Sequence, residues 1–193
     1  MTIKLVVGLG NPGPRYATHR HNVGIWFLER LAAQHRASFR PEAKLKASLT
    51  TITVQNQDIR LLIPNTYMNE SGQAVQAAAH FYKYESTEIL VVHDELDFAP
   101  GTIRFKEGGG HGGHNGLRDI ISKLGKQDFA RLRIGIGHPG DKALVHNYVL
   151  SAPNKSDEKL ILDAIDEALC HIDTFTVGDR ARAVNALHEK NGK

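Results

Sequence analysis

Three short apolar runs, each followed by glycine or polar residues, constrain the fold of this chain most strongly. Residues 3–9, 88–92 and 132–136 are rich in Leu, Val and Ile. Such runs are typical of strands buried on both faces, as in a parallel sheet covered by helices. Between them, segments such as 22–35 and 115–124 carry apolar residues at helical spacing. Because strands alternate with helices, the sequence predicts an α/β fold.

A β-hairpin adds antiparallel strands to this scheme. Residues 49–54 alternate in polarity, 56–58 read Asn-Gln-Asp, and 59–63 return as an apolar segment. We therefore expect a mixed, twisted sheet flanked by helices, and after residue 141 a mostly helical C-terminal part. No repeat or low-complexity linker divides the 193 residues, so we expect a single domain, 1–193.

Composition excludes several classes of protein. No apolar run approaches the roughly 18 residues that a membrane-spanning helix needs, and the opening MTIKLVVGLG is too short an apolar segment for a signal peptide. The single cysteine permits no intramolecular disulfide. We expect a cytoplasmic protein with no membrane partner. The formal charge of +3 permits a polyanionic partner without requiring one.

Glycines dominate residues 108–116, which read GGGHGGHNG. Glycine lets a backbone approach a ligand closely. This stretch lacks the G-K-[ST] ending of a P-loop, however, and in GLGNPG (residues 8–13) the third glycine is misplaced for a dinucleotide fingerprint and Pro12 blocks the helix. We expect neither nucleotide binding nor a cofactor.

Polar clusters follow the predicted strands, at Asn11 and in residues 65–69 and 93–97. Ligands of open α/β sheets gather beyond the carboxyl ends of the strands, so these clusters indicate one site. A histidine that activates water as a general base needs a carboxylate to orient it and to favour its imidazolium form. His21 in RHNVG and Asp94 in HDELD form the natural pair.

No covalent nucleophile is indicated. G-x-S-x-G is absent, and Ser71 is best interpreted as the N-cap of the helix that follows it. Asn115 is a second candidate N-cap. Its alternative role is to recognise an amide or ester through paired donors and acceptors.

Two alternatives to a metal-free hydrolase remain open on these residues. One is a zinc or two-metal hydrolase whose ligands come from His93, Asp94, Glu95, Asp97, His111 and His114. The other is a non-catalytic RNA-binding module that uses the asparagines and the dense basic residues between 104 and 142. Against that module, the chain lacks the aromatic stacking run of an RRM.

Six motifs in order connect the sequence to a known family: GLGNPG, RHNVG, PNTYMNESG, HDELD, GGGHGGHNGLRD and RIGIGHP. Together they closely resemble bacterial peptidyl-tRNA hydrolases, and they cover residues 3–142. The resemblance implies a monomeric, metal-free esterase with a mixed sheet. Such an enzyme cleaves the ester that joins a peptide to the 3′ end of tRNA, in the rescue of abandoned translation products.

The resemblance also assigns roles to residues. It makes His21 the general base, Asp94 the group that holds it in its basic form, and Asn11 the residue that distinguishes a blocked from a free α-amino group. Contacts to tRNA or its peptidyl end are expected from Tyr16, Tyr67, Met68, Asn69, His114 and Asn115. A clamp on the tRNA 5′ phosphate is expected from Lys106 and Arg133. One position departs from the family pattern, because His19 stands where Thr is usual.

Overall fold

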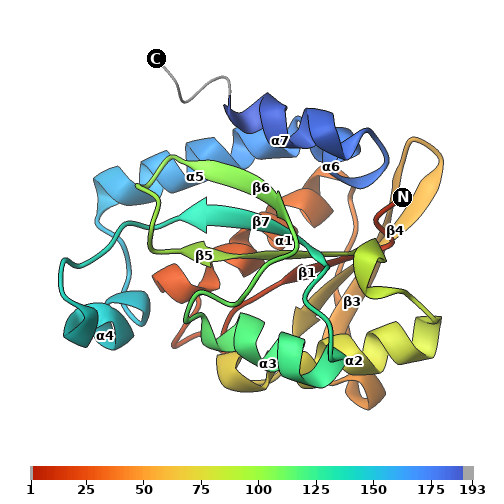
Figure 1. Ribbon diagram of the computed structural model, residues 1–193, viewed down its shortest axis with the longest axis horizontal. Coiled ribbons are helices and arrows are strands. Elements are labelled where there is room, and N and C mark those ends of the chain that lie inside the picture. Colours follow the sequence, from red (N-terminus) through yellow and green to blue (C-terminus); the bar gives the residue numbers. More distant parts are fainter. Residues whose placement is uncertain (1, 189–193) are drawn as a thin grey trace.

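A seven-stranded sheet, in the order β2-β3-β4-β1-β5-β7-β6, forms the centre of the computed structural model, which describes residues 2–188 (Figure 1). Its strands are β1 (Leu5–Gly8), β2 (Arg40–Glu42), β3 (Ala47–Val54), β4 (Gln57–Pro64), β5 (Ile89–Glu95), β6 (Ile103–Glu107) and β7 (Ala130–Gly135). The four central strands are mutually parallel, and β2, β3 and β6 add antiparallel pairs at the two edges. The predicted mixed sheet of an α/β fold is confirmed.

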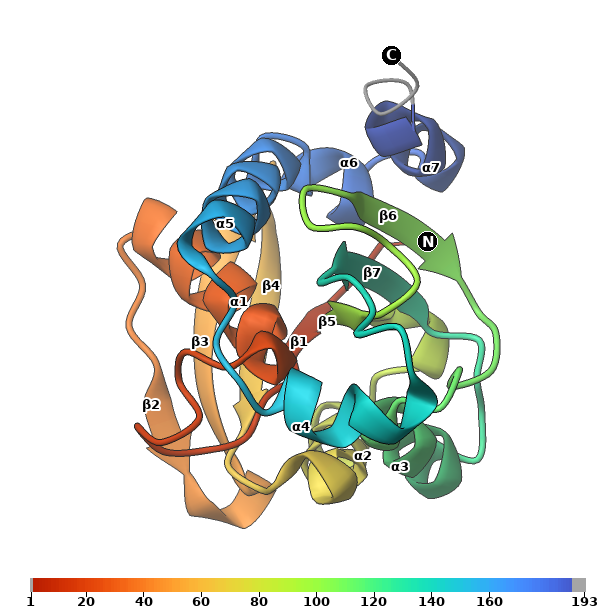
Figure 2. The same cartoon turned by 90° about the vertical axis from the view of Figure 1, so that its left-hand side faces the viewer.

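Helices cover both faces of this sheet (Figures 1 and 2). They are α1 (Val23–Gln34), α2 (Ser71–Tyr82), α3 (Asn115–Leu124), α4 (Val145–Val149), α5 (Lys155–Leu169), α6 (Ile172–Thr176) and α7 (Arg180–His188). Val6 packs in the core beneath α1 and α5, whereas Leu5 and Val7 pack beneath α2 and α3. Successive side chains of β1 thus enter opposite cores, which is why its sequence is apolar throughout. Within residues 2–188, no helix has the length and hydropathy to span a membrane.

The start of α1 lies directly on the end of β1 and on the middle of β5 because residue 24 is a glycine. A Cβ on Gly24 would lie 2.3 Å from the carbonyl oxygen of Val92 and 2.7 Å from the backbone nitrogen of Leu9. Only glycine tolerates so close an approach. This contact places the 3₁₀ turn Arg20–Asn22, and with it His21, beside the end of β5.

Three local predictions were wrong in detail. The hairpin turns at Gln55 and Asn56, both with positive φ, as a two-residue turn requires, rather than at 56–58. Strand β5 continues through residues 93–95, which were expected to follow it. Ser71 is the first residue of α2 and does not cap it; its hydroxyl donates to the Met68 carbonyl at 2.7 Å.

One strand was not predicted. β2 has only three residues, all of them exposed, and includes Pro41. Proline is confined to sheet edges because it cannot donate to the ladder. A segment this short, without apolar alternation, carries no strand signal.

Candidate active site

One cavity of about 870 Å³ opens at the carboxyl ends of the central strands and extends along β6 and β7. All eleven candidate residues line it: Asn11, Tyr16, His21, Tyr67, Met68, Asn69, Asp94, Lys106, His114, Asn115 and Arg133. Parallel strands bring their carboxyl ends to one edge, so loops far apart in sequence meet there. The structure therefore brings the candidates together, and their individual roles remain predictions.

A hydrogen-bonded histidine–aspartate pair lies in this cavity. His21 Nδ1 is 2.8 Å from Asp94 Oδ2, and their side chains are 10% and 2% exposed. When Nδ1 carries the ring proton and donates a hydrogen bond to the carboxylate, Nε2 keeps the lone pair that a general base needs.

The charges of the pair reinforce one another. Burial disfavours the charged form of His21, but the charge of Asp94 and its hydrogen bond outweigh burial, so the pKa of His21 is raised. Burial acts in the opposite sense on Asp94, yet His21 and His114 hold the pKa of Asp94 well below its usual range. Asp94 is thus a carboxylate that favours the imidazolium formed when His21 takes a proton.

Asp94 has a second histidine partner that the sequence did not indicate. His114 Nε2 is 2.7 Å from Asp94 Oδ1, while His114 Nδ1 accepts from the backbone nitrogens of Gly116 and Leu117 at 3.1 and 3.3 Å. His114 is therefore the N-cap of α3. The prediction that Asn115 caps this helix was wrong, since Asn115 is its first residue.

The side chain of Asn11 is oriented by its neighbours. Its Oδ1 accepts from the backbone nitrogen of Met68 at 2.7 Å, and its Nδ2 makes no hydrogen bond to any described residue, so this amide of the cavity lining keeps its donors for a ligand. Asn22 holds the Asn11 backbone from both sides: its Oδ1 accepts from Asn11 N and its Nδ2 donates to Asn11 O, each at 2.9 Å. Sequence reasoning missed Asn22, because nothing local shows that a residue eleven positions earlier is its partner.

Arg131 shapes the glycine stretch. Its guanidinium donates to the carbonyl oxygens of Gly109 and Gly110, and burial lowers its pKa to about 10. Gly109 and Gly113 have φ of 113° and 85°, in the region that favours glycine. The glycines thus let the loop fold back over an arginine. In the sequence, Arg131 was only one of several basic residues.

Four cations share one face of the β6–β7 pair, namely Arg104, Lys106, Arg131 and Arg133. Arg131 is engaged by the glycine loop, and Arg104 donates to the Leu187 carbonyl at 3.1 Å. Arg133 lies 3.8 Å from Glu95, a loose pair, and Lys106 makes no ion pair with any residue that the structure describes. Lys106 and Arg133 are the two cations of this face best placed to receive an anion, and both line the cavity.

Two tyrosines form part of the cavity wall. The rings of Tyr16 and Tyr67 meet edge to face with centroids 6.1 Å apart, and Tyr67 is 55% exposed. His19 packs against Tyr16 from outside the cavity, and burial together with Arg15 lowers its pKa. The unusual histidine at position 19 therefore supports a tyrosine and does not reach the His21–Asp94 pair.

Of the ligands named for the zinc-hydrolase alternative, only Asp94 and His114 converge, and they do so with His21. Among residues 2–188, the one group with converging ligand atoms is His21, Asp94 and His114, within 4.8 Å of one another. Their atoms already pair as two short hydrogen bonds, which a metal would have to replace. His111 is not part of this group, and its Nδ1 accepts from Gly113 N at 2.9 Å. The His111–His114 site of the zinc-hydrolase alternative is not among the converging ligand groups of the part of the chain that the structure describes.

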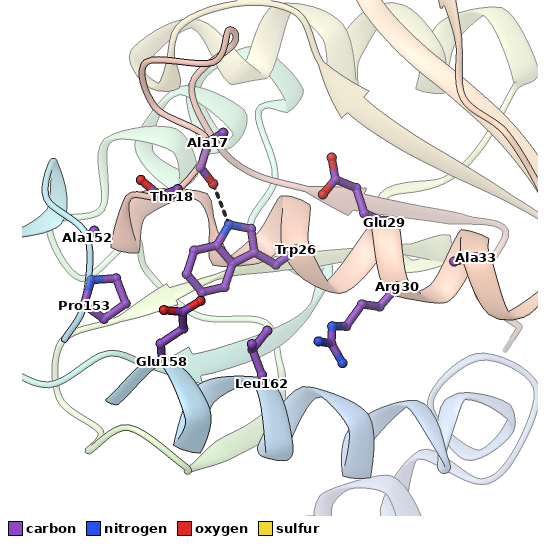
Figure 3. Close-up of a pocket in the computed structure, with 10 residues that line it drawn as sticks. All are labelled: Ala17, Thr18, Trp26, Glu29, Arg30, Ala33, Ala152, Pro153, Glu158 and Leu162. Atoms are coloured by element: carbon purple, nitrogen blue, oxygen red, sulfur yellow. Dashed lines mark hydrogen bonds between the residues drawn. The ribbon is translucent and has the colours of Figure 1, made fainter. Parts of the chain in front are cut away.

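A second hollow, of about 580 Å³, lies between α1 and α5 (Figure 3). Figure 3 shows the indole of Trp26 on its wall, with Nε1 donating to the Ala17 carbonyl at 2.8 Å. None of the eleven candidates lines this hollow, and its carboxylates, Glu29 and Glu158, have no histidine beside them within its lining. It is separate from the candidate active site.

The fold and the site together define a class: an α/β protein whose buried histidine–aspartate pair opens on a large cavity, as in hydrolases that use a general base. The family model described as peptidyl-tRNA hydrolase matches residues 5–193. The chain belongs to the peptidyl-tRNA hydrolase family of enzymes.

Individual relatives match over nearly their full lengths. A peptidyl-tRNA hydrolase of Aeromonas hydrophila is 54% identical over 96% of this chain and 94% of its own. One of Legionella pneumophila is 53% identical over 97% of this chain and all of its own. The crystal structure of peptidyl-tRNA hydrolase from Acinetobacter baumannii superposes with a TM-score of 0.93 at 46% identity, over 96% and 94% of the two chains. The resemblance found in the sequence is confirmed.

Proposed function

We propose that this protein hydrolyses the ester bond of peptidyl-tRNA, with His21 as general base and without a metal. The observation that carries the proposal is the His21–Asp94 pair, which lines the cavity of a peptidyl-tRNA hydrolase family member and leaves His21 Nε2 without a hydrogen bond to any described residue. His21 Nε2 takes a proton from water while the water oxygen bonds to the ester carbonyl carbon. The carbon–oxygen bond to the tRNA then breaks. The 3′ oxygen leaves with a proton from the imidazolium, and the peptide leaves as a carboxylic acid.

A metal is not required by this chemistry. An ester is already activated, so a positioned base with hydrogen-bond donors for the developing oxyanion is enough. The direct test is release of peptide from N-acetyl-aminoacyl-tRNA by protein treated exhaustively with EDTA. We expect full activity. Loss on chelation and recovery with stoichiometric zinc would instead assign His21, Asp94 and His114 to a metal.

We further propose that residues 1–193 act as one monomeric domain in the cytoplasm, where tRNA is found. One continuous sheet carries every strand among the described residues, which supports the single domain. Light scattering after size exclusion should give the mass of one 21.3 kDa chain for the free protein, and the mass of one chain plus one tRNA for the complex.

Replacing Asn11 by Asp should weaken the preference for N-blocked substrates. An aspartate oxygen still accepts from Met68 N, so the side chain stays in place, but the Nδ2 donor is lost. A carboxylate repels the carbonyl oxygen of a blocking acyl group and attracts a free ammonium. We expect the ratio of kcat/KM for N-acetyl-aminoacyl-tRNA over free aminoacyl-tRNA to fall by roughly 10- to 100-fold.

Asn65→Asp is the matched control, because Asn65 pairs with Ser48 and does not line the cavity. It makes the same chemical change outside the site and should leave the ratio unchanged. If Asn11→Asp also leaves it unchanged, selectivity lies elsewhere.

Lys106 and Arg133 should account for much of the salt dependence of tRNA binding. Each phosphate contact releases counterions, so log affinity falls with log salt by about 0.7 to 0.9 per contact. Replacing either residue by Ala should weaken tRNA binding and reduce this slope by roughly the amount that one phosphate contact contributes. Hydrolysis of a minimal ester without the tRNA body should change little.

Lys44→Ala removes an equal charge beside β2, at the sheet edge opposite β6, and serves as the control. The clamp is refuted if Lys106→Ala and Arg133→Ala both keep the wild-type slope. It is equally refuted if both lose turnover of the minimal ester.

A further inference from the structure

We infer that His114 is a positioning residue for Asp94, and that the first turn of α3 selects the tautomer in which it acts. The inference rests on the proposed function, because it assigns His114 a part in the same reaction. It replaces the expectation that His114 only contacts the tRNA or its peptidyl end.

The tautomer follows from the partners of the two ring nitrogens. Two backbone N–H groups, of Gly116 and Leu117, point at His114 Nδ1, so this nitrogen must present a lone pair. The ring proton then lies on Nε2, which donates to Asp94 Oδ1 at 2.7 Å. A helix N-terminus thereby fixes a proton on the far side of the ring.

The hydrogen bond between His114 and Asp94 is buried, and other side chains pack closely around it. The side chains of His114 and Asp94 are 9% and 2% exposed. The rings of His21 and His93 approach that of His114 with centroids 5.0 and 5.1 Å away. The other acidic, basic and histidine side chains of the cavity lining, apart from His21 and His93, are Glu95, Asp97, Lys106, His111, Arg131, Arg133, His138, Lys142 and His146.

His93 does not compete for the carboxylate. Its Nδ1 donates to the backbone carbonyl of Asp94 at 2.8 Å, and its Nε2 is buried without a partner among the described residues. Burial, and after it the neighbouring His114, lowers the pKa of His93 to about 3. His93 is therefore uncharged, and the ring of His114 packs against its ring.

Each carboxylate oxygen of Asp94 therefore has one histidine donor. His114 holds Oδ1, which aims Oδ2 at His21 Nδ1 and keeps the base in its active tautomer. The backbone amides of α3 orient His114, His114 orients Asp94, and Asp94 orients His21. Without His114, Asp94 is free to rotate away from His21.

His114→Asn separates the two roles of this side chain. Asparagine is among the best N-cap residues, so α3 keeps its cap, but the shorter side chain does not reach Asp94. We expect kcat to fall by roughly 10- to 100-fold with KM unchanged. Asp94 then turns away from His21 and stabilises the His21 imidazolium less, so the pKa of His21 falls. The acid limb of the kcat profile should therefore move to lower pH, by about half a unit to one unit.

Asn154→Ala is the matched control, because Asn154 caps α5 through a 2.8 Å bond to Asp157 N and lies outside the cavity. It removes a helix cap without touching Asp94. Its acid limb should coincide with that of the wild type.

In the Asp94→Asn background, the His114→Asn change is expected to raise activity, whereas in the wild type it lowers activity. An amide has one acceptor, its oxygen, which the fixed Nε2–H of His114 claims. The amide N–H then faces His21 and favours the inactive tautomer. Adding His114→Asn frees the amide to turn its oxygen to His21, so the double variant should be several-fold faster than Asp94→Asn alone.

Two results would overturn the inference. One is a His114→Asn variant that raises KM while kcat and the acid limb stay at wild-type values, since that pattern belongs to a substrate contact. The other is ¹⁵N NMR of the wild type showing the proton of neutral His114 on Nδ1. The NMR measurement needs no turnover, so it separates failure of this inference from failure of the proposed function.

Discussion

Replacing His21 by Ala is expected to lower kcat by about 10²–10⁴-fold while tRNA affinity stays nearly intact. In the proposed mechanism the imidazole is the base beside which Asp94 is aligned, and the cations proposed to bind phosphate lie on β6 and β7. Single-turnover hydrolysis of N-acetyl-aminoacyl-tRNA and equilibrium tRNA binding on the same variant measure the two quantities separately.

His19→Thr is the control for this variant, because it removes a histidine two positions away that does not line the cavity. It should keep near wild-type turnover of a minimal ester. A His21→Ala variant that retains turnover would transfer the role of base to another histidine.

Asp94→Asn is expected to lower kcat by about 10²–10³-fold, the second largest effect of a single change. The variant keeps the shape of the side chain but presents one acceptor to two histidine donors. It also removes the charge that raises the pKa of His21, so burial alone remains and lowers that pKa. Because only neutral His21 is active, the acid limb of the residual activity should move to lower pH.

The pH profile of kcat/KM, recorded between about pH 5 and about pH 9, checks this direction. Asp163→Asn makes the same charge change on the exposed face of α5, where Asp163 pairs with Lys159, and should leave the limb in place. A limb that moves to higher pH in Asp94→Asn would contradict the assignment of Asp94.

The sequence determined the class of fold and the family through local patterns. An apolar run with both faces buried reads as a central strand, and β1 is one. Residues 115–124 form a helix, as their helical spacing predicted, and it ends at Gly125, whose φ of 67° suits a glycine. Both signals depend on burial and on backbone preference within a few residues, and these are properties that a sequence displays directly. Six ordered motifs then identified the family and the His21–Asp94 pair.

The tertiary structure alone decided how the site is held. His21 and Asp94 are 73 positions apart in the sequence. The hydrogen bond between them depends on Gly24, which lets α1 lie on β1 and β5. The same holds for His114, whose proton position follows from the direction in which α3 leaves the glycine loop. Nothing local marks these partners. A hydrogen bond is set by the position and orientation of two groups in space, and these emerge only when the strands and helices have packed.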